Sequence, residues 1–60
     1  MNKKKKDFYT VKDVAELLGV SISKVHTYIK KDQIEAYQIL GNGPYRISPD
    51  EFRRLERENG

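Results

Sequence analysis

The chain has 60 residues, no cysteine and one histidine, which excludes a disulfide framework and a His/Cys zinc site. Twelve lysines and arginines stand against nine aspartates and glutamates, a formal net charge of +3. No apolar run approaches the roughly 18 residues of a membrane span, and the lysine-rich start lacks the apolar stretch of a secretory signal. We therefore expect one small cytoplasmic domain without membrane association.

The positive charge is concentrated in two segments. Residues 1–9 carry four lysines and one aspartate, and residues 20–48 have a net charge of +2, while the two remaining segments are each slightly acidic. This asymmetry suggests a polyanionic partner. A solubilising tail and an ordinary surface explain the same numbers, so charge alone leaves both interpretations open.

The first seven residues read as a disordered basic arm, and the ordered domain is predicted to span residues 8–58. The lysines of the arm either lie along a nucleic acid or only improve solubility. Phe8 and Tyr9 begin the ordered part, where we expect them to brace the hydrophobic face.

A first helix is predicted over residues 11–18. Thr10 is a good N-cap, and Asp13 stands at the position that completes a capping box. Apolar residues from Val11 onwards recur on one helical face. Gly19 suits the left-handed position that ends a helix.

A second helix is predicted over residues 21–31, with Ser21 as its cap. On a helical wheel its apolar and polar residues occupy opposite arcs. The apolar arc comprises Ile22, Val25, Tyr28 and Ile29, and the polar arc comprises Ser23, Lys24, His26, Thr27, Lys30 and Lys31. Because only two or three residues link the two helices, they must cross sharply.

A hairpin is predicted over residues 36–47, where the apolar period changes to two. Residues 41–44, Gly-Asn-Gly-Pro, are a loop signal, and a short strand follows them. We expect a four-residue loop, because Pro44 lacks the N–H that would close a tight turn. Tyr37 and Tyr45 are expected to be core residues rather than stacking platforms for bases.

The segment Ser48-Pro49-Asp50-Glu51 predicts the start of a last helix. Serine suits the N-cap, proline the first helical position, and Glu51 completes a capping box. The helix is predicted to end near Arg57 and to offer Phe52 and Leu55 to the core.

The polar face of the second helix combines chemistry that suits a nucleic acid. Hydroxyl and imidazole groups can hydrogen-bond base edges, while lysines neutralise phosphate. No aspartate or glutamate interrupts residues 21–31, whereas the other two helices mix both signs. A merely solvated polar face is the alternative interpretation.

Two patterns resemble known DNA-binding families. Ala15, Gly19 and Val25, spaced as Ala-x3-Gly-x5-Val, resemble the general helix-turn-helix pattern. The stretches YTVKDVAELLGVSISKVHTYIKKDQI and GNGPYRISPDEFRRL resemble the excisionase-type branch of the MerR-like winged-helix domains. The resemblance implies an α+β, mainly α, fold: a small winged helix-turn-helix of two helices, a short β-hairpin wing and a C-terminal helix.

The resemblance also implies that the second helix enters the major groove and that the hairpin from Gly41 to Arg46 is the wing. Arg46 matches the basic wing residue of the family, although an outward strand residue paired with Glu35 is the alternative. Asn42 is explained better by its backbone preference than by contact. The candidate DNA-binding residues are Ser21, Ser23, Lys24, His26, Thr27, Lys30, Lys31, Asn42 and Arg46.

His26 invites a metal or catalytic interpretation, and both lack partners in the sequence. A metal would need a second histidine or a cysteine, and a pair with Ser23 has no orienting acid or oxyanion site. We expect no enzyme activity, no cofactor and no small-molecule substrate.

The sequence thus predicts sequence-preferring binding of double-stranded DNA, as a transcriptional regulator or as an excisionase-like architectural factor at the nucleoid. Further copies of the chain or a recombinase would be partners on DNA. A protein-interaction module that uses the same basic helix surface is the alternative function.

Overall fold

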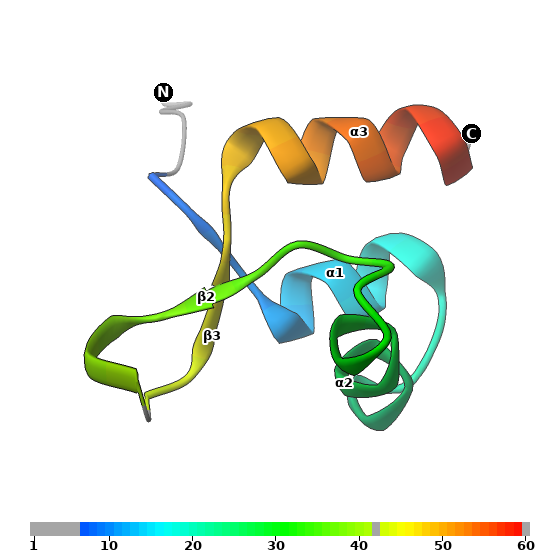
Figure 1. Ribbon diagram of the computed structural model, residues 1–60. Coiled ribbons are helices and arrows are strands. Elements are labelled where there is room, and N and C mark those ends of the chain that lie inside the picture. The colour runs from blue at the N-terminus through cyan, green and yellow to red at the C-terminus, as the bar shows by residue number, and fades with distance from the viewer. Residues whose placement is uncertain (1–6, 42, 60) are drawn as a thin grey trace.

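The computed structural model describes residues 7–41 and 43–59, which form three helices and three short strands. The elements are, in chain order, β1 (Tyr9–Thr10), α1 (Val11–Leu18), α2 (Ile22–Lys30), β2 (Tyr37–Gln38), the 3₁₀ segment η1 (Ile39–Gly41), β3 (Tyr45–Ile47) and α3 (Pro49–Asn59). Helix α3 lies at one end of the molecule, and α2 and the β2–β3 loop lie at the other (Figure 1). The predicted small winged helix-turn-helix is confirmed.

Local capping sets both ends of α1 at the predicted positions. The Thr10 hydroxyl accepts a hydrogen bond from the Asp13 N–H at 3.1 Å, and the Asp13 carboxylate accepts one from the Thr10 N–H at 3.0 Å. This is the predicted capping box. At the other end Gly19 has a φ of 71°, and the Val20 N–H donates to the Ala15 carbonyl at 3.0 Å. Glycine adopts this left-handed conformation without steric cost.

Helix α2 ends at Lys30, one residue before the predicted end. The helix is terminated by Asp32, which takes a left-handed backbone conformation with a φ of 61°. The Gln33 N–H then donates to the Tyr28 carbonyl at 2.9 Å, which is the long hydrogen bond of a Schellman motif. This turn leads Ile34, which is only 3% exposed, directly into the core.

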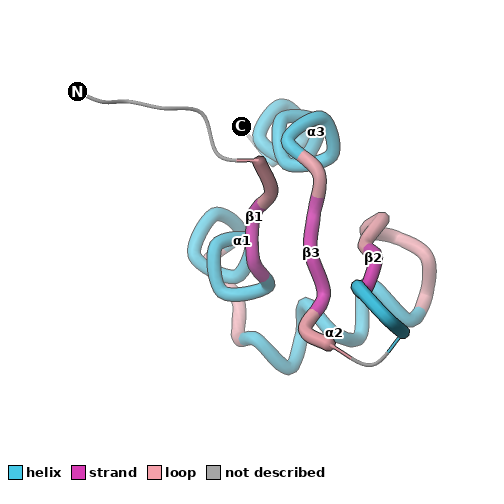
Figure 2. Tube along the Cα trace, turned by 90° about the vertical axis from the view of Figure 1, so that its left-hand side faces the viewer, coloured by secondary structure: helices cyan, strands magenta, loops and turns pink. Residues whose placement is uncertain are grey.

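The strands form one antiparallel sheet in the order β1-β3-β2, with β3 in the centre (Figure 2). The predicted hairpin is confirmed as the pair β2 and β3, although its strands are shorter than expected. Strand β1 was not predicted. It pairs Tyr9 with Ile47 and Thr10 with Arg46, and two residues carry no alternation that a sequence could reveal.

The prediction of a four-residue hairpin loop is wrong. Gln38 pairs with Tyr45, so residues 39–44 form the connection. The Gln38 side-chain Nε2 closes it by donating to the Gly43 carbonyl at 2.6 Å. The 3₁₀ segment η1 (Ile39–Gly41) lies within this connection.

Helix α3 begins as predicted and extends to Asn59, two residues beyond the predicted end. The Ser48 hydroxyl accepts from the Glu51 N–H at 3.1 Å, which confirms the N-cap. The Glu51 carboxylate, however, accepts from the Glu35 N–H and from the Arg54 Nε, each at 2.9 Å. The second half of the predicted capping box is thus replaced by a tie between α3 and the segment that follows α2.

The core lies where the three helices meet the sheet, and Phe52 and Leu55 contribute to it as predicted. The Tyr9 ring stacks on the Phe52 ring with centroids 3.8 Å apart. Tyr37 is 47% exposed, so its prediction as a core residue is wrong; it pairs with Arg46 on the outer face of the sheet. The buried apolar residues are Val14, Ala15, Val25, Ile29, Ile34, Ile47 and Leu55. None of the helices in the described part of the chain has the length and apolarity to cross a membrane.

Candidate nucleic-acid interface

Helix α2 is anchored to the core by one side and leaves the other side open. Val25 is fully buried and Ile29 is 8% exposed, so the opposite face of the helix points to solvent. The exposed members of this face, including the cap and the residue after the helix, are Ser21, Ser23, Lys24, His26, Thr27, Lys30 and Lys31. We call these residues the α2 polar face. Helix α2, which carries or adjoins all of these residues, lies at the end of the molecule away from α3 (Figure 1).

Hydrogen bonds within the helix orient part of the α2 polar face. The Ser21 hydroxyl caps the helix by accepting from the Lys24 N–H at 3.1 Å. The Thr27 hydroxyl donates to the Ser23 carbonyl at 3.2 Å. The hydroxyl proton of Thr27 therefore points to the helix backbone, and the lone pairs of the hydroxyl oxygen face outward as hydrogen-bond acceptors.

The cations of the α2 polar face differ in their surroundings. Lys24 extends its ammonium over the ring of Tyr28, 5.7 Å from the centroid, a cation–π contact. Lys30 is the last helical residue, while Lys31 lies beyond it as the C-cap. The predicted continuous helical face thus ends one residue early, and Lys31 belongs to the turn.

Ile22 departs from the predicted apolar arc. It is 47% exposed, whereas Val25, Tyr28 and Ile29 pack on the core. Ile22 occupies the first helical position, a full turn before the part of α2 that the core covers. An exposed aliphatic group therefore borders the α2 polar face. A helical wheel could not reveal this exposure, because it shows the direction in which a side chain points but not whether the core covers that part of the helix.

Arg46 lies on the outer face of the sheet, at the base of the wing. Its guanidinium carbon is 4.2 Å from the centroid of the Phe8 ring. The antiparallel pairing of β1 with β3 brings these two side chains together, since Thr10 stands opposite Arg46 and Phe8 is two residues earlier. Phe8 was expected to brace the hydrophobic core; the structure places it under the wing arginine instead.

A hollow joins α2 to the sheet and to the first turn of α1. Lys12, His26 and Arg46 line it together with residues of the wing. The His26 ring lies 5.9 Å from the Tyr45 ring, in a tilted orientation. Lys12 was absent from the predicted site, because only the pairing of β1 with β3 brings α1 beside the wing. Asn42, the remaining candidate, lies outside the described residues.

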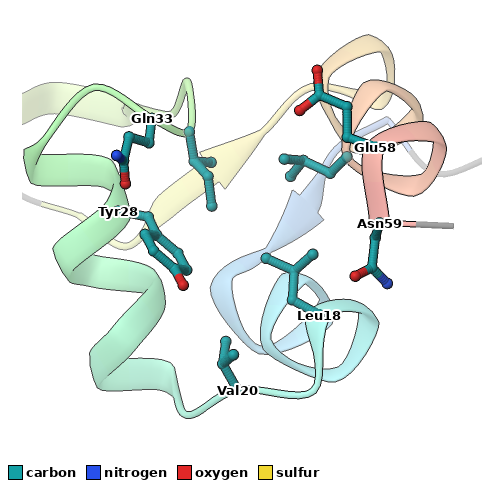
Figure 3. A pocket seen from close by; sticks show the side chains of 8 residues that line it. Leu18, Val20, Tyr28, Gln33, Glu58 and Asn59 are labelled. Atoms are coloured by element: carbon teal, nitrogen blue, oxygen red, sulfur yellow. The ribbon is translucent and has the colours of Figure 1, made fainter.

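A second hollow lies where the C-terminal ends of the three helices converge (Figure 3). Leu18, Val20 and Tyr28 form its largely apolar wall. The Asn59 side chain at its rim donates to the Leu17 carbonyl at 3.1 Å and ties α3 to α1. This hollow is a seam between packed helices, and the groups of the α2 polar face that suit polyanions lie outside it.

A sequence profile described as "Helix-turn-helix domain" matches residues 8–60 of the chain. No protein with a curated description and no solved structure matches the chain. The profile match covers most of the chain and supports a helix-turn-helix DNA-binding domain.

Proposed function

The chain belongs to the helix-turn-helix domain family, and from that premise we propose that α2 enters the major groove of duplex DNA while the β2–β3 wing contacts the adjacent groove or backbone. The binding is sequence-preferring. It serves either transcriptional regulation or an excisionase-like architectural role in site-specific recombination, at the nucleoid in the cytoplasm.

One observation carries this proposal: the α2 polar face is exposed and contains no acid. The α2 polar face carries three lysines, three serine or threonine hydroxyls and one imidazole, and residues 21–31 contain no aspartate or glutamate. The described residues of α3, by contrast, pair Arg53 with Asp50 and Arg54 with Glu51 and Glu58. A helix whose polar face only contacts solvent usually carries charges of both signs, as α3 does, whereas the acid-free polar face of α2 suits a polyanion.

Phosphate contacts would supply most of the affinity. Lys24, Lys30, Lys31 and Arg46, with part of the basic arm, would neutralise about four to five phosphates. Each neutralised phosphate contributes about −0.9 to the slope of log affinity against log salt concentration, so a slope of about −4 is expected. The exposed N-terminus of α2 behind Ser21 favours one further phosphate oxygen there.

Base edges would be read by the short side chains of the α2 polar face. The outward lone pairs of Thr27 suit the exocyclic amino group of adenine or cytosine, and Ser23 lies one turn earlier. The exposed Ile22 suits the methyl group of thymine. These contacts support a preference among sequences rather than high selectivity.

A single module of this size buries only about 600–1,000 Å² of protein surface on DNA. Useful selectivity therefore calls for several copies side by side or for a partner such as a recombinase. Binding as several copies or with a partner is compatible with the regulatory role and with the recombination role alike.

Titration of the chain against random duplex DNA and against heparin, at two salt concentrations, tests the proposal. We expect duplex binding with a salt slope near −4, reduced by about one unit in Lys30→Ala without a change in sequence preference. Arg57→Ala is the matched control, since it removes an exposed cation from α3 at the opposite end. Equal slopes for the two variants would remove Lys30 from the interface.

The alternative function is a protein-interaction module that presents the α2 polar face to an acidic partner. It predicts weak binding to both polyanions, whereas a generic polycation binds heparin and duplex alike. Absence of duplex binding at low salt would overturn the proposed function and leave this alternative.

A further inference from the structure

The structure extends the wing to the whole β2–β3 hairpin, and Leu40 lies in the connection between its two strands. Leu40 is 93% exposed, far above the 47% of Ile22 and Tyr37, the other exposed large apolar residues of the described chain. It also has a φ of 63° and a ψ of 11°, in the left-handed region. That conformation is unfavourable for any residue with a Cβ, and aliphatic side chains gain nothing locally in return. The isolated fold therefore carries both an exposed leucine and a strained backbone at this position.

The wing holds this conformation by its own hydrogen bond. The Gln38 Nε2 donates to the Gly43 carbonyl at 2.6 Å, which joins the two sides of the loop around Leu40. Gly41 follows with a φ of 80°, so two successive residues take left-handed geometry. The loop is thus built to present the Leu40 side chain outward.

The end of the wing lacks the charge that would let it bind phosphate. Residues 36–45 contain no lysine, arginine, aspartate or glutamate. The nearest cation along the chain, Arg46, stands at the base of the wing over the Phe8 ring. Any contact that the end of the wing makes with DNA must therefore be apolar or use neutral hydrogen bonds.

Both views place the 3₁₀ segment that carries Leu40 at the same end of the molecule as α2, and α3 at the other end (Figures 1 and 2). A helix seated in the major groove brings such a wing beside the neighbouring minor groove. Apolar side chains, leucine among them, are used by minor-groove proteins to separate base steps and kink the duplex.

We propose that Leu40 is an apolar wedge, which enters the minor groove next to the α2 site and partly unstacks one base step. The inference rests on the proposed DNA binding and adds a second, uncharged contact to it. DNA bound by the chain is bent at the wing side, and the bend depends on the leucine side chain rather than on charge.

The test measures DNA bending by energy transfer between dyes at the two ends of a short bound duplex. The variants are Leu40→Asn and Leu40→Gly, which tolerate a left-handed backbone without an apolar side chain, and Leu40→Met, which retains one. We expect the wild-type chain and Leu40→Met to bend the duplex by an angle within the range of about 20–90° seen for such wedges. Leu40→Asn and Leu40→Gly are expected to lose the bend and to bind about tenfold more weakly.

Thermal unfolding separates this role from a structural one. Leu40→Gly is expected to unfold at a temperature equal to or higher than the wild-type chain, because it relieves the backbone strain. The affinity for DNA would then fall without a loss of stability. A straight duplex in the wild-type complex, or wild-type bending by Leu40→Asn, overturns the wedge while leaving the proposed function intact. Absence of any wild-type duplex binding overturns both.

Discussion

The Glu51 side chain ties α3 to the segment after α2, and replacing it with alanine tests how much stability its contacts contribute. Its side chain is 7% exposed, and its carboxylate accepts hydrogen bonds from the Glu35 N–H and from the Arg54 guanidinium. Glu51→Ala removes both acceptors but keeps the backbone N–H that the Ser48 hydroxyl caps. The variant therefore removes the tie to the Glu35 N–H together with the ion pair to Arg54 within α3.

The magnitude follows from the two contacts that are lost. A hydrogen bond to a charged group contributes about 1.5–3 kcal/mol, and solvent screening reduces the share of Arg54, whose side chain is 35% exposed. We expect a loss of about 2 kcal/mol. A 60-residue domain has only about 3–9 kcal/mol of stability in total. At about 4–8 °C for each kcal/mol, the unfolding midpoint should fall by about 8–16 °C.

Thermal and urea unfolding followed by circular dichroism measure this loss. Glu56→Ala, an exposed acid on the same helix, is the matched control and should change stability by less than about 0.5 kcal/mol. Arg54→Ala and the double variant complete a cycle whose coupling energy reports the ion pair itself. A midpoint for Glu51→Ala within about 2 °C of the wild-type value would refute the reasoning, since the tie would then contribute nothing.

Three further outcomes are expected. The hydrogen bond from Arg54 lowers the pKa of the Glu51 carboxyl in the folded protein below its ordinary 4.5. The stabilisation that the ionised carboxylate gives is complete above pH 4.5 and should be lost as the pH falls through the lowered pKa. Glu51→Gln should flatten this part of the curve of stability against pH. Phe8→Ala should weaken duplex binding by about two- to fivefold, with Phe8→Tyr restoring it, because the ring supports the Arg46 guanidinium by a cation–π contact; equal affinities would remove that support. Thr27→Ala should reduce the affinity ratio between preferred and random duplexes without changing the salt slope, and an unchanged ratio would exclude Thr27 from base reading.

The features that the sequence predicted well are those decided by neighbours in the chain. The Thr10–Asp13 capping box and the left-handed Gly19 involve residues three or four apart, so their residue types alone indicate them. Ser48 and Pro49 define the start of α3 in the same way. The direction of the α2 polar face followed from helical periodicity, which depends on spacing only.

The features that escaped prediction depend on partners distant in the sequence. Glu51 suits a capping box by position, yet a backbone N–H sixteen residues earlier and Arg54 take its carboxylate. The two-residue strand β1 exists only because β3 is available to pair with it. That pairing is also what brings Phe8 and Lys12 beside the wing, so the site could be predicted along α2 but not at its junction with the sheet.

The two ends of the proposed interface use different physics, and salt should separate them. The contribution of Lys30 on α2 is electrostatic and includes the release of counterions, so the cost of Lys30→Ala should shrink as the salt concentration rises. The contribution of Leu40 arises from apolar burial, which the moderate salt of a binding assay hardly changes. The ratio of wild-type to Leu40→Asn affinity should therefore stay nearly constant from about 50 to 200 mM salt. The logarithm of the ratio of wild-type to Lys30→Ala affinity should fall by about 0.9 for each tenfold rise in salt concentration. The same salt dependence of the two affinity ratios would mean that one kind of contact operates at both α2 and the wing.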